Sequence, residues 1–508
     1  MAIYSRPGVF IQEVVPTQTI APASNGTAIG AFVGVLSQGP TSVPILVSTW
    51  SQFTKIFGVL SDAYPTTWAA YNFFGNGGRQ LYVKRVVSGG AQATHTFQDS
   101  ATHDTLTIKA GNVGTWGNNL SVQVKAAGTS TRFNLVVSLN GIAVEQFTDL
   151  SMVSTDPRYA ITVINTDSSY VLAVDAASIS VGVLKNPIAN ISALTSGADG
   201  SALVRTDYST ALTSFDSIQN PLIFNNPDAA FIYDNTKTTT EQTLAQNVMG
   251  DLLDYAAVRG DGFAIIDVPQ GQTPTAAQTF AAAVLTAAPD STGNNGAAYY
   301  PWYNIPNSLR AVPGSTKLVP PGPAMAGQYL ATDASIGVFK TPAGYGNRIA
   351  NAVSTEIQLS NTQLDSLNDG TNPINVIRYV PGSGIVVMGG RTILNSPGDR
   401  YINVRRSMIY LKKQLTDLSA FAVFENNDAR LWTHIKIVLS EFLRSYWQAG
   451  GLHGNSGDQA FYVQCDSSTT SAADILAGRV NINVGVALEY PAEFIVISLG
   501  QLTGNAKA

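Results

Sequence analysis

The spacing of apolar residues divides the chain into stretches with different periods. Between about residues 95 and 201, apolar and polar residues alternate, which is typical of half-buried strands. The Asn140-Gly141 pair lies between two such runs and predicts a tight hairpin. We therefore expect an inserted all-β domain at 95–201, with strands in TLTIKA, LSVQVKA, FNLVVSLNG, YAITVIN and YVLAVDA.

The flanking stretches, residues 26–94 and 202–390, combine short buried strands with helical segments. Continuous apolar runs bounded by turns predict strands in TAIGAFVG, LYVKRVV, FAIIDVP, INVIRYV and GIVVMGG. Helices are predicted to begin near Ser48 or Thr49 and to span residues 64–75 and 242–258. Because strands and helices alternate, we expect these two stretches to form one α/β core.

Residues 391–500 have the pattern of an α+β domain. The segment 396–399 carries Ser, Pro and Asp in the order that begins a helix. A second helix is predicted from Asn427 or Asp428 to about Gln448. Strands are predicted to follow in AFYVQCD, VNINVGVALE and AEFIVISLGQ, and residues 501–508 form a loose tail.

The first 25 residues form an extended arm. They contain one short apolar run that predicts a strand, and Pro residues and turn residues bound it on both sides. No second run lies close enough to make a hairpin, so this strand must pair with a distant one. The run consists of Val9, Phe10, Ile11, Gln12, Glu13 and Val14.

Charge, cysteine content and the length of the apolar runs exclude several functional classes. Lys and Arg number 29 against 34 Asp and Glu, a net charge of −5, whereas a nucleic-acid surface is normally basic. One cysteine, Cys465, forms no internal disulfide. We find no signal peptide and no apolar run near the ~20 residues that span a bilayer. We expect a soluble protein without membrane insertion.

Residue types that carry chemistry are scarce. The four histidines, His95, His103, His434 and His453, have no metal-ligand spacing, and HExxH and CxxC motifs are absent. There is no GxSxG nucleophile elbow, and the glycine runs lack the strand-to-helix context of a phosphate loop. We therefore expect no enzyme activity, no cofactor and no metal site.

One basic cluster is prominent in a chain with only 12% charged residues. It lies on the two predicted C-terminal helices. Its members either form an ordinary solvated helix face or present a basic surface to an acidic partner. They are Arg405, Arg406, Lys412, Lys413, Arg430 and Lys436.

The order of the segments resembles the contractile tail sheath family. The similar segments begin with YSRPGVFIQEV, TAIGAFVGVLSQGP and FFGNGGRQLYVKRV. They continue through VPPGPAMAGQYLATDASIGVFKTPAG and end with YINVRRSMIYL, FENNDARLW and YPAEFIVISLGQ. No single motif is decisive, but the ordered set covers nearly the whole chain.

This resemblance implies an α/β core that is partly subtilisin-like in topology and lacks protease activity. It implies subunits that stack as rings or helical strands around an inner tube and contract without nucleotide. The arms would exchange between subunits, with Thr17 to Asn25 as a hinge. The C-terminal exchange strand would be Phe494, Ile495, Val496 and Ile497.

The implied partners are further copies of the chain, the tail tube protein, and baseplate and tail terminator proteins. The implied location is a virion tail or contractile injection particle, assembled in the cytoplasm of the host bacterium. The basic cluster would face the tube, and the insertion at 95–201 would face outward. The alternatives are a subtilisin-like hydrolase, active or inactive, and a surface-layer or adhesin-type protein.

Overall fold

The structure, a computed structural model, describes residues 28–232, 238–289, 294–396 and 398–493. Its centre is a sheet that has eight strands within these residues, in the order β18-β17-β13-β12-β11-β1-β3-β2. The six inner strands run parallel, and β2 and β18 close the edges in antiparallel orientation. The strands are β1 (Ile29–Gly34), β2 (Ile45–Val47), β3 (Leu81–Arg85), β11 (Leu222–Asn225), β12 (Gly262–Asp267), β13 (Gly296–Tyr300), β17 (Ile374–Val380) and β18 (Gly384–Met388).

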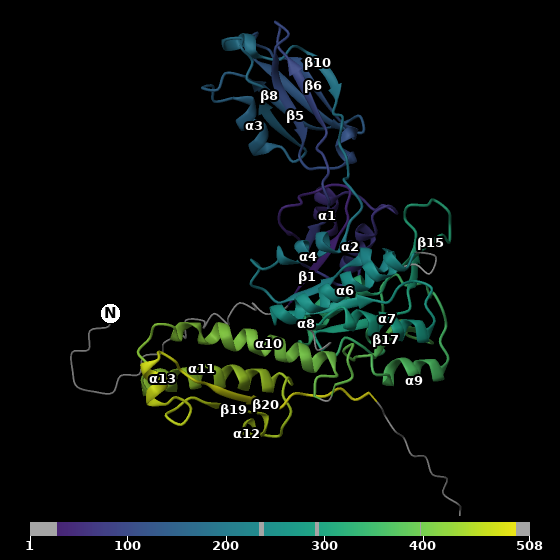
Figure 1. The fold of residues 1–508 in the computed structure, drawn as a ribbon, viewed down its shortest axis with the longest axis vertical. Helices are drawn as coiled ribbons and strands as arrows, with labels where there is room; N and C mark the ends of the chain where they lie inside the picture. The colour runs from purple at the N-terminus through teal and green to yellow at the C-terminus, as the bar shows by residue number, and fades with distance from the viewer. Residues whose placement is uncertain (1–27, 233–237, 290–293, 397, 494–508) are drawn as a thin grey trace, which may run out of the picture.

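Helices pack on both faces of this sheet (Figure 1). Its inner strands are therefore almost entirely buried. On one face lie α4 (Arg205–Thr213), α5 (Pro227–Ile232), α6 (Thr239–Arg259), α7 (Pro274–Thr286) and α9 (Asn361–Asp369). On the other lie α1 (Trp50–Phe57), α2 (Pro65–Gly75) and α8 (Gly322–Ser335). The helices predicted near Thr49, at 64–75 and at 242–258 are confirmed as α1, α2 and α6. A small sheet of β14 (Tyr303–Pro306), β15 (Thr316–Val319) and β16 (Ser354–Thr355) adjoins them.

Two antiparallel sheets interrupt the core between β3 and α4. They are β4-β5-β9 and β10-β6-β7-β8, and β7 and β8 meet at Asn140-Gly141, where both residues have positive φ. Reciprocal backbone hydrogen bonds between Thr94 and Thr195 join the two sheets edge to edge. The strands are β4 (Thr94–Gln98), β5 (Asp104–Ala110), β6 (Leu120–Ala126), β7 (Phe133–Leu139), β8 (Ile142–Leu150), β9 (Val171–Asp175) and β10 (Asn190–Ala193).

Arg85, at the end of β3, fastens this β-rich region to the core. Its side chain is buried and donates to the carbonyl oxygens of Leu36 (2.8 Å), Gly39 (3.0 Å) and Val113 (2.9 Å). Burial lowers the pKa of Arg85 to about 10, so the guanidinium stays charged at neutral pH. Figure 1 shows the β-rich region projecting from the core at one end of the longest axis of the molecule.

The strand predicted in YAITVIN is wrong, because Ala160–Asp167 forms the helix α3. Ala160, Val163 and Ile164 are buried, at the i, i+3 and i+4 spacing of one helix face. The Asn165 side chain bonds both the N–H and the C=O of Ala173 in β9. Burial against β9 therefore overrides the local strand propensity of this segment.

The last part of the chain contains α10 (Ile402–Ser419), α11 (Ala429–Gln448), α12 (Gly457–Ala460), β19 (Phe461–Gln464), α13 (Ala472–Leu476) and β20 (Asn483–Val486). The second predicted helix is confirmed, and Asp428 caps it by accepting from Arg430 N and Leu431 N. The predicted start of the first helix at 396–399 is wrong. Gly398 has φ +92, and Arg391 pairs with Tyr401, so the chain turns back once more before α10 begins.

Two buried carboxyl groups lie at the carboxyl ends of the central strands. Asp228 follows β11 and accepts from Val35 N and from Thr66 Oγ1 (3.0 Å). Asp267 ends β12 and accepts from Asn225 Nδ2 (2.8 Å) and from Gly322 N at the start of α8. Burial raises the pKa of each carboxyl to about 7.

These pKa values predict that the folded chain loses stability as the pH rises toward 7. Each folded-state pKa lies above the unfolded value, so the contribution to the unfolding free energy is complete below about pH 4. It then falls by ~1.4 kcal/mol per pH unit per carboxyl until the pH passes the folded pKa. Asp228→Asn should remove one such slope in urea unfolding between pH 5 and 7, and Asp167→Asn, an exposed control, should not. Parallel wild-type and Asp228→Asn curves would contradict this account.

Candidate assembly interface

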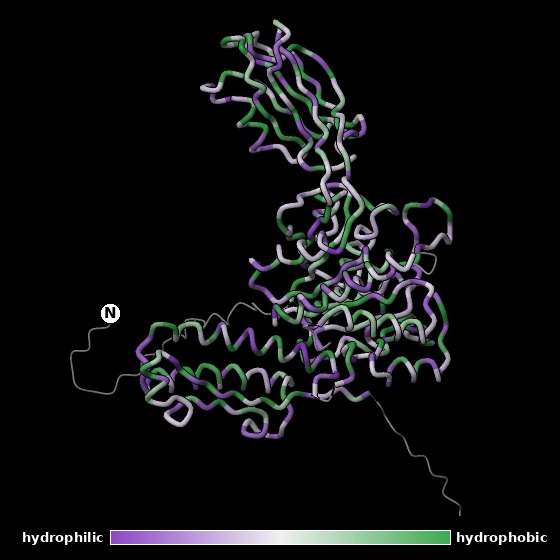
Figure 2. Tube along the Cα trace, in the orientation of Figure 1, coloured by the Kyte–Doolittle hydropathy of each residue, from purple (hydrophilic) through white to green (hydrophobic). Residues whose placement is uncertain are grey.

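The C-terminal helices α10 and α11 pack side by side beneath the α/β core (Figure 1). Figure 2 shows apolar and polar segments alternating along both helices. The apolar side of α11, with Leu431, Ile435, Leu439 and Tyr446, faces a separate core that also includes residues of β19 and β20. This helical unit therefore has its own packing and is joined to the α/β core through α10.

Arg406 of α10 forms a buried polar link between this unit and the core. Its guanidinium binds both carboxylate oxygens of Asp333 on α8, with 2.9 Å between Nη1 and Oδ1. It also lies over the ring of Tyr329, 4.7 Å from the ring centroid. Burial alone would lower the pKa of Arg406, but Asp333 opposes burial and the pKa stays above its ordinary value. Both side chains of the pair are almost completely removed from solvent.

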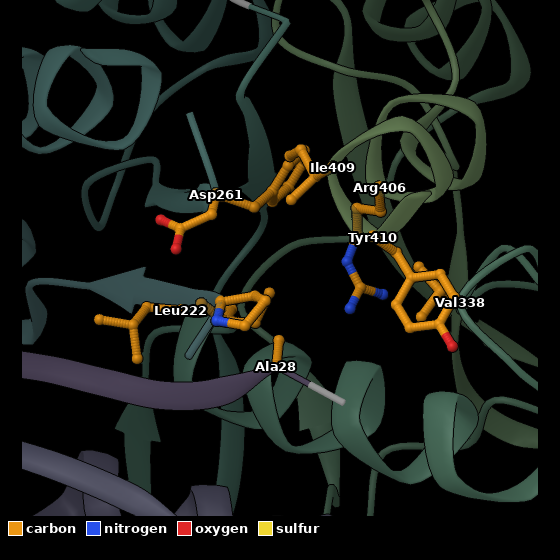
Figure 3. Close-up of a pocket in the computed structure, with 10 residues that line it drawn as sticks. Ala28, Leu222, Asp261, Val338, Arg406, Ile409 and Tyr410 are labelled. Carbon is orange, nitrogen blue, oxygen red and sulfur yellow. The ribbon is translucent and has the colours of Figure 1, made fainter. Parts of the chain in front are cut away.

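A small crevice beside Arg406 shows how closely α10 meets the core. Arg406 and Tyr410 line one side, and Ala28, Leu222 and Asp261 line the other (Figure 3). Its volume is about 20 Å³, room for roughly one water molecule. These core residues lie at the amino-terminal ends of β1, β11 and β12, so α10 packs against that edge of the sheet.

The structure separates the six basic residues that the sequence grouped together. Arg406 is buried and paired, so it is not a surface residue of this chain, and its assignment to a basic surface is corrected. Arg405 is half-buried and donates to Asn295 Oδ1 (2.7 Å). The other four lie in the second half of α10 and the first half of α11, and we call these halves with their connection the hairpin tip. These four residues are Lys412, Lys413, Arg430 and Lys436.

The hairpin tip is less basic than the sequence suggested. Lys413 pairs with Asp417 (2.7 Å), and Arg430 pairs with Asp428 (3.2 Å). The connection between the helices also exposes two apolar side chains, Val423 (65%) and Phe424 (104%). Phe424 has φ +70, a backbone conformation that is unusual for a bulky residue. The tip is therefore an amphipathic surface rather than a uniformly cationic one.

Strands β19 and β20 form a sheet of only two strands among the described residues. Four residue pairs join them, from Phe461 with Val486 to Gln464 with Asn483. Two strands alone are marginally stable, and their outer edges present unpaired backbone groups. Val484 and Val486 are only half-buried against the C-terminal core. Among the described residues, the outer edges of β19 and β20 have no strand partner.

The predicted exchange strands fall outside the described residues. These are Val9 to Val14 and Phe494 to Ile497, and the predicted hinge at Thr17 to Asn25 also lies outside. The described chain begins at Ala28, next to β1, and ends at Glu493. Arg391 in the core binds Glu493, with 2.7 Å between Nη2 and Oε2. Neither Asp333 nor Glu493 was singled out in the sequence, although a lone carboxylate within the apolar helix GPAMAGQYLATDAS is a sign of a buried pair.

Within the described ranges, no group of three or more His, Cys, Asp or Glu side chains is placed to hold a metal ion. No helix among them is long and apolar enough to cross a membrane. Cys465 is buried, and its thiol pKa is raised by burial. The features of this region are those of packing and of exposed strand edges.

Known proteins resemble this chain in sequence or in fold. Residues 396–500 match the family described as phage tail sheath C-terminal domain. The tail sheath protein of Enterobacteria phage T4 is 28% identical in an alignment of 204 positions that covers 37% of this chain and 28% of that protein. The chain thus aligns with little more than a quarter of the length of this curated relative.

Solved structures extend the likeness in fold to nearly the whole chain. The sheath tail protein from Listeria innocua has a TM-score of 0.62 at 13% identity, covering 91% of this chain and 95% of that one. The helical sheath of the anti-feeding prophage in its contracted state has a TM-score of 0.57 at 20% identity, covering 98% and 100%.

These findings define the class as a mixed α/β protein with several sheets and the fold of sheath subunits. The predicted resemblance to the contractile tail sheath family is confirmed, by sequence in the C-terminal part and by fold along nearly the whole chain. The named relatives are structural sheath proteins and not enzymes, in agreement with the prediction.

Replacing Arg406 with Met is predicted to lower the unfolding free energy by about 3–5 kcal/mol, because Asp333 would stay buried without its partner. The double variant Arg406→Met/Asp333→Leu should recover most of the loss, since two apolar residues leave no buried charge. Urea unfolding measures both. An unchanged midpoint for Arg406→Met would show that the pair does not join the two units.

Proposed function

We propose that this chain is the structural subunit of a contractile tail sheath, which polymerises around an inner tube and contracts to drive the tube through a target envelope. The observation that carries the proposal is the two-stranded sheet β19–β20, with an exchange strand predicted at each end of the same chain. The sheath fold of the solved relatives supports it.

Strand addition explains how the subunits would join. A strand from a neighbour pairs with the outer edge of β19 or β20 through backbone hydrogen bonds. Each such bond contributes about 0.5–1.5 kcal/mol net, so a joint of a few residues is firm but needs no particular side chains. The strands are Val9 to Val14 at one end and Phe494 to Ile497 at the other. Flexible linkers would let the joint survive movement of the subunits.

The chain is proposed to divide as its sequence predicts. Residues 1–25 are the N-terminal arm, 26–94 with 202–390 the core, 95–201 an outward-facing insertion, 391–500 the C-terminal domain and 501–508 the tail. The first residues of that C-terminal stretch, Arg391 to Ile393, pack against the core. The projection of the β-rich region in Figure 1 supports an outward insertion. The parallel sheet with helices on both faces is compatible with a subtilisin-like topology in part of the core.

The hairpin tip is our candidate for the contact with the tube. Its exposed cations, Lys412 and Lys436, and the apolar Val423 and Phe424 fit a weak grip that breaks on contraction. The partners are further copies of the chain, the tube, and baseplate and terminator proteins. The particle is a phage tail or contractile injection particle assembled in the host cytoplasm.

Deleting residues 1–16, or residues 494–508, should leave a folded monomer that no longer polymerises, because each deletion removes one exchange strand. Deleting only residues 501–508 is the matched control, because it keeps Phe494 to Ile497. Electron microscopy and sedimentation measure the polymer, and thermal unfolding checks the monomer. Tubes of normal length and yield from either long deletion would overturn the strand-exchange proposal.

Reversing charge at Lys412 and Lys436, both to Glu, should weaken attachment to purified tubes about tenfold, since two exposed charge contacts are worth roughly 1–2 kcal/mol together. Reversal at two exposed lysines elsewhere, Lys55→Glu/Lys125→Glu, controls for net charge. Co-sedimentation with tubes at two salt concentrations is the measurement. Equal attachment of both variants would remove the hairpin tip from the tube contact.

A further inference from the structure

The segment from Ala487 to Glu493 leaves the C-terminal unit and crosses to the α/β core. It begins directly after β20, where Ala487 N donates to Ala460 O (2.8 Å) and Leu488 pairs with Leu452. It ends at Glu493, the last described residue before the C-terminal exchange strand. The place where this segment ends therefore decides from which part of the subunit that strand departs.

Three of the contacts of this segment reach α10 and the core. The Asn403 side chain donates to the carbonyl oxygens of Phe339 and Glu489, both at 3.0 Å. The rings of Tyr401 and Tyr490 meet edge to face, 5.9 Å apart. The third contact is the ion pair between Arg391 and Glu493. The first two involve the start of α10, whereas the third lies in the core.

The ion pair between Arg391 and Glu493 is bidentate and mostly enclosed. Arg391 Nε lies 3.1 Å from Oε1, and Nη2 lies 2.7 Å from Oε2. The exposed fractions of the two side chains are 4% and 16%. Such a pair fixes the carboxylate in direction as well as in distance.

Other hydrogen bonds join Arg391 to the core. Nη1 donates to Asn368 O at the end of α9 (2.8 Å). The backbone of Arg391 is bonded twice by the buried side chain of Asn375 in β17, once through its N–H and once through its C=O, both at 2.8 Å. Arg391 is thus part of the rigid core, and Glu493 is held to the core through it.

We propose that Arg391 is a positioning residue for assembly, which through Glu493 anchors the root of the C-terminal exchange strand to the α/β core. This rests on the proposed function. The donor strand then departs from the core, while the sheet that accepts strands, β19–β20, belongs to the C-terminal unit of each subunit. A strand given by one subunit therefore couples its core to the C-terminal unit of a neighbour.

The anchor favours assembly by shortening the freely moving part of the chain. Without it, the nearest remaining contacts are those of Tyr490 and Glu489, so three more residues would move with the strand. Ordering these three residues on binding costs free energy. In the anchored subunit they are already ordered before binding, so this cost is absent. A longer mobile segment before the exchange strand also connects neighbouring subunits more loosely. A movement of one subunit is then transmitted less directly to the next.

Glu493→Gln tests the anchor while the exchange strand stays intact. The matched control is Asp251→Asn, because Asp251 also forms a bidentate pair with an arginine, Arg205 (Nε–Oδ2 2.8 Å), and is equally enclosed at 15% exposed. In the monomer, Glu493→Gln should speed hydrogen exchange of the amides of Ala492 and Glu493, the residues beyond the contacts of Tyr490, and leave β19 and β20 unchanged. Its critical concentration for polymerisation should rise about fivefold or more, as expected when ordering costs are restored.

Three results would overturn the proposal. They are unchanged exchange of those two amides, unchanged polymerisation, or an equal rise in critical concentration for Asp251→Asn. Arg391→Lys separates positioning from stability, since one ammonium group keeps the charge but not the two-point geometry. It should show the same exchange and assembly defects at a smaller size.

The failure of strand exchange is distinguishable from the failure of the anchor. If deletion of residues 494–508 leaves polymerisation intact, the proposed function fails at that end. If that deletion abolishes polymerisation but Glu493→Gln behaves as the control does, strand exchange stands and the anchor is rejected.

Discussion

Arg406 and Asp333 join two parts of the molecule that otherwise have separate cores. The first part is the parallel sheet with its helices, and the second is the unit of α10, α11 and the β19–β20 sheet. Neither charge tolerates the loss of the other, since both are removed from water. Their contact therefore fixes the position of the β19–β20 sheet relative to the core, where Arg391 binds Glu493.

The parts of the chain are joined to one core by buried polar contacts. The core is rigid, with buried parallel strands and helices on both faces. Arg85 fastens the β-rich region to it, and Arg406 fastens the C-terminal helices. Arg391 holds the last described residue. Three buried arginines thus set the positions of the parts, and adjacent subunits in the proposed sheath would move as rigid bodies joined by strands.

Much of this fold follows from the sequence, because burial leaves a local pattern. Strands such as Ile29–Gly34 are continuous apolar runs, since the sheet is covered on both faces. The segment of α3 was misread because it is too short for the strand and helix periods to differ clearly, and its contacts with β9 decide the outcome. The residues at 396–399 have the sequence pattern of a helix start, but the chain forms a turn there and α10 begins at Ile402.

The interface was less predictable, because it depends on contacts between distant residues. Arg406 and Asp333 are 73 positions apart, and Arg391 and Glu493 are 102 apart. A basic residue on a predicted helix has the same appearance whether it faces solvent or a buried carboxylate. Only the fold shows that Arg406 is enclosed while Lys412 and Lys436 are exposed.

The most direct test of the account is a cryo-electron microscopy map of the polymerised protein at side-chain resolution. The account predicts that β19 and β20 gain strands from neighbouring subunits, and that these are the segments around Val9 to Val14 and Phe494 to Ile497. A polymer in which β19–β20 remains two-stranded, with subunits joined only by side-chain contacts elsewhere, would contradict it.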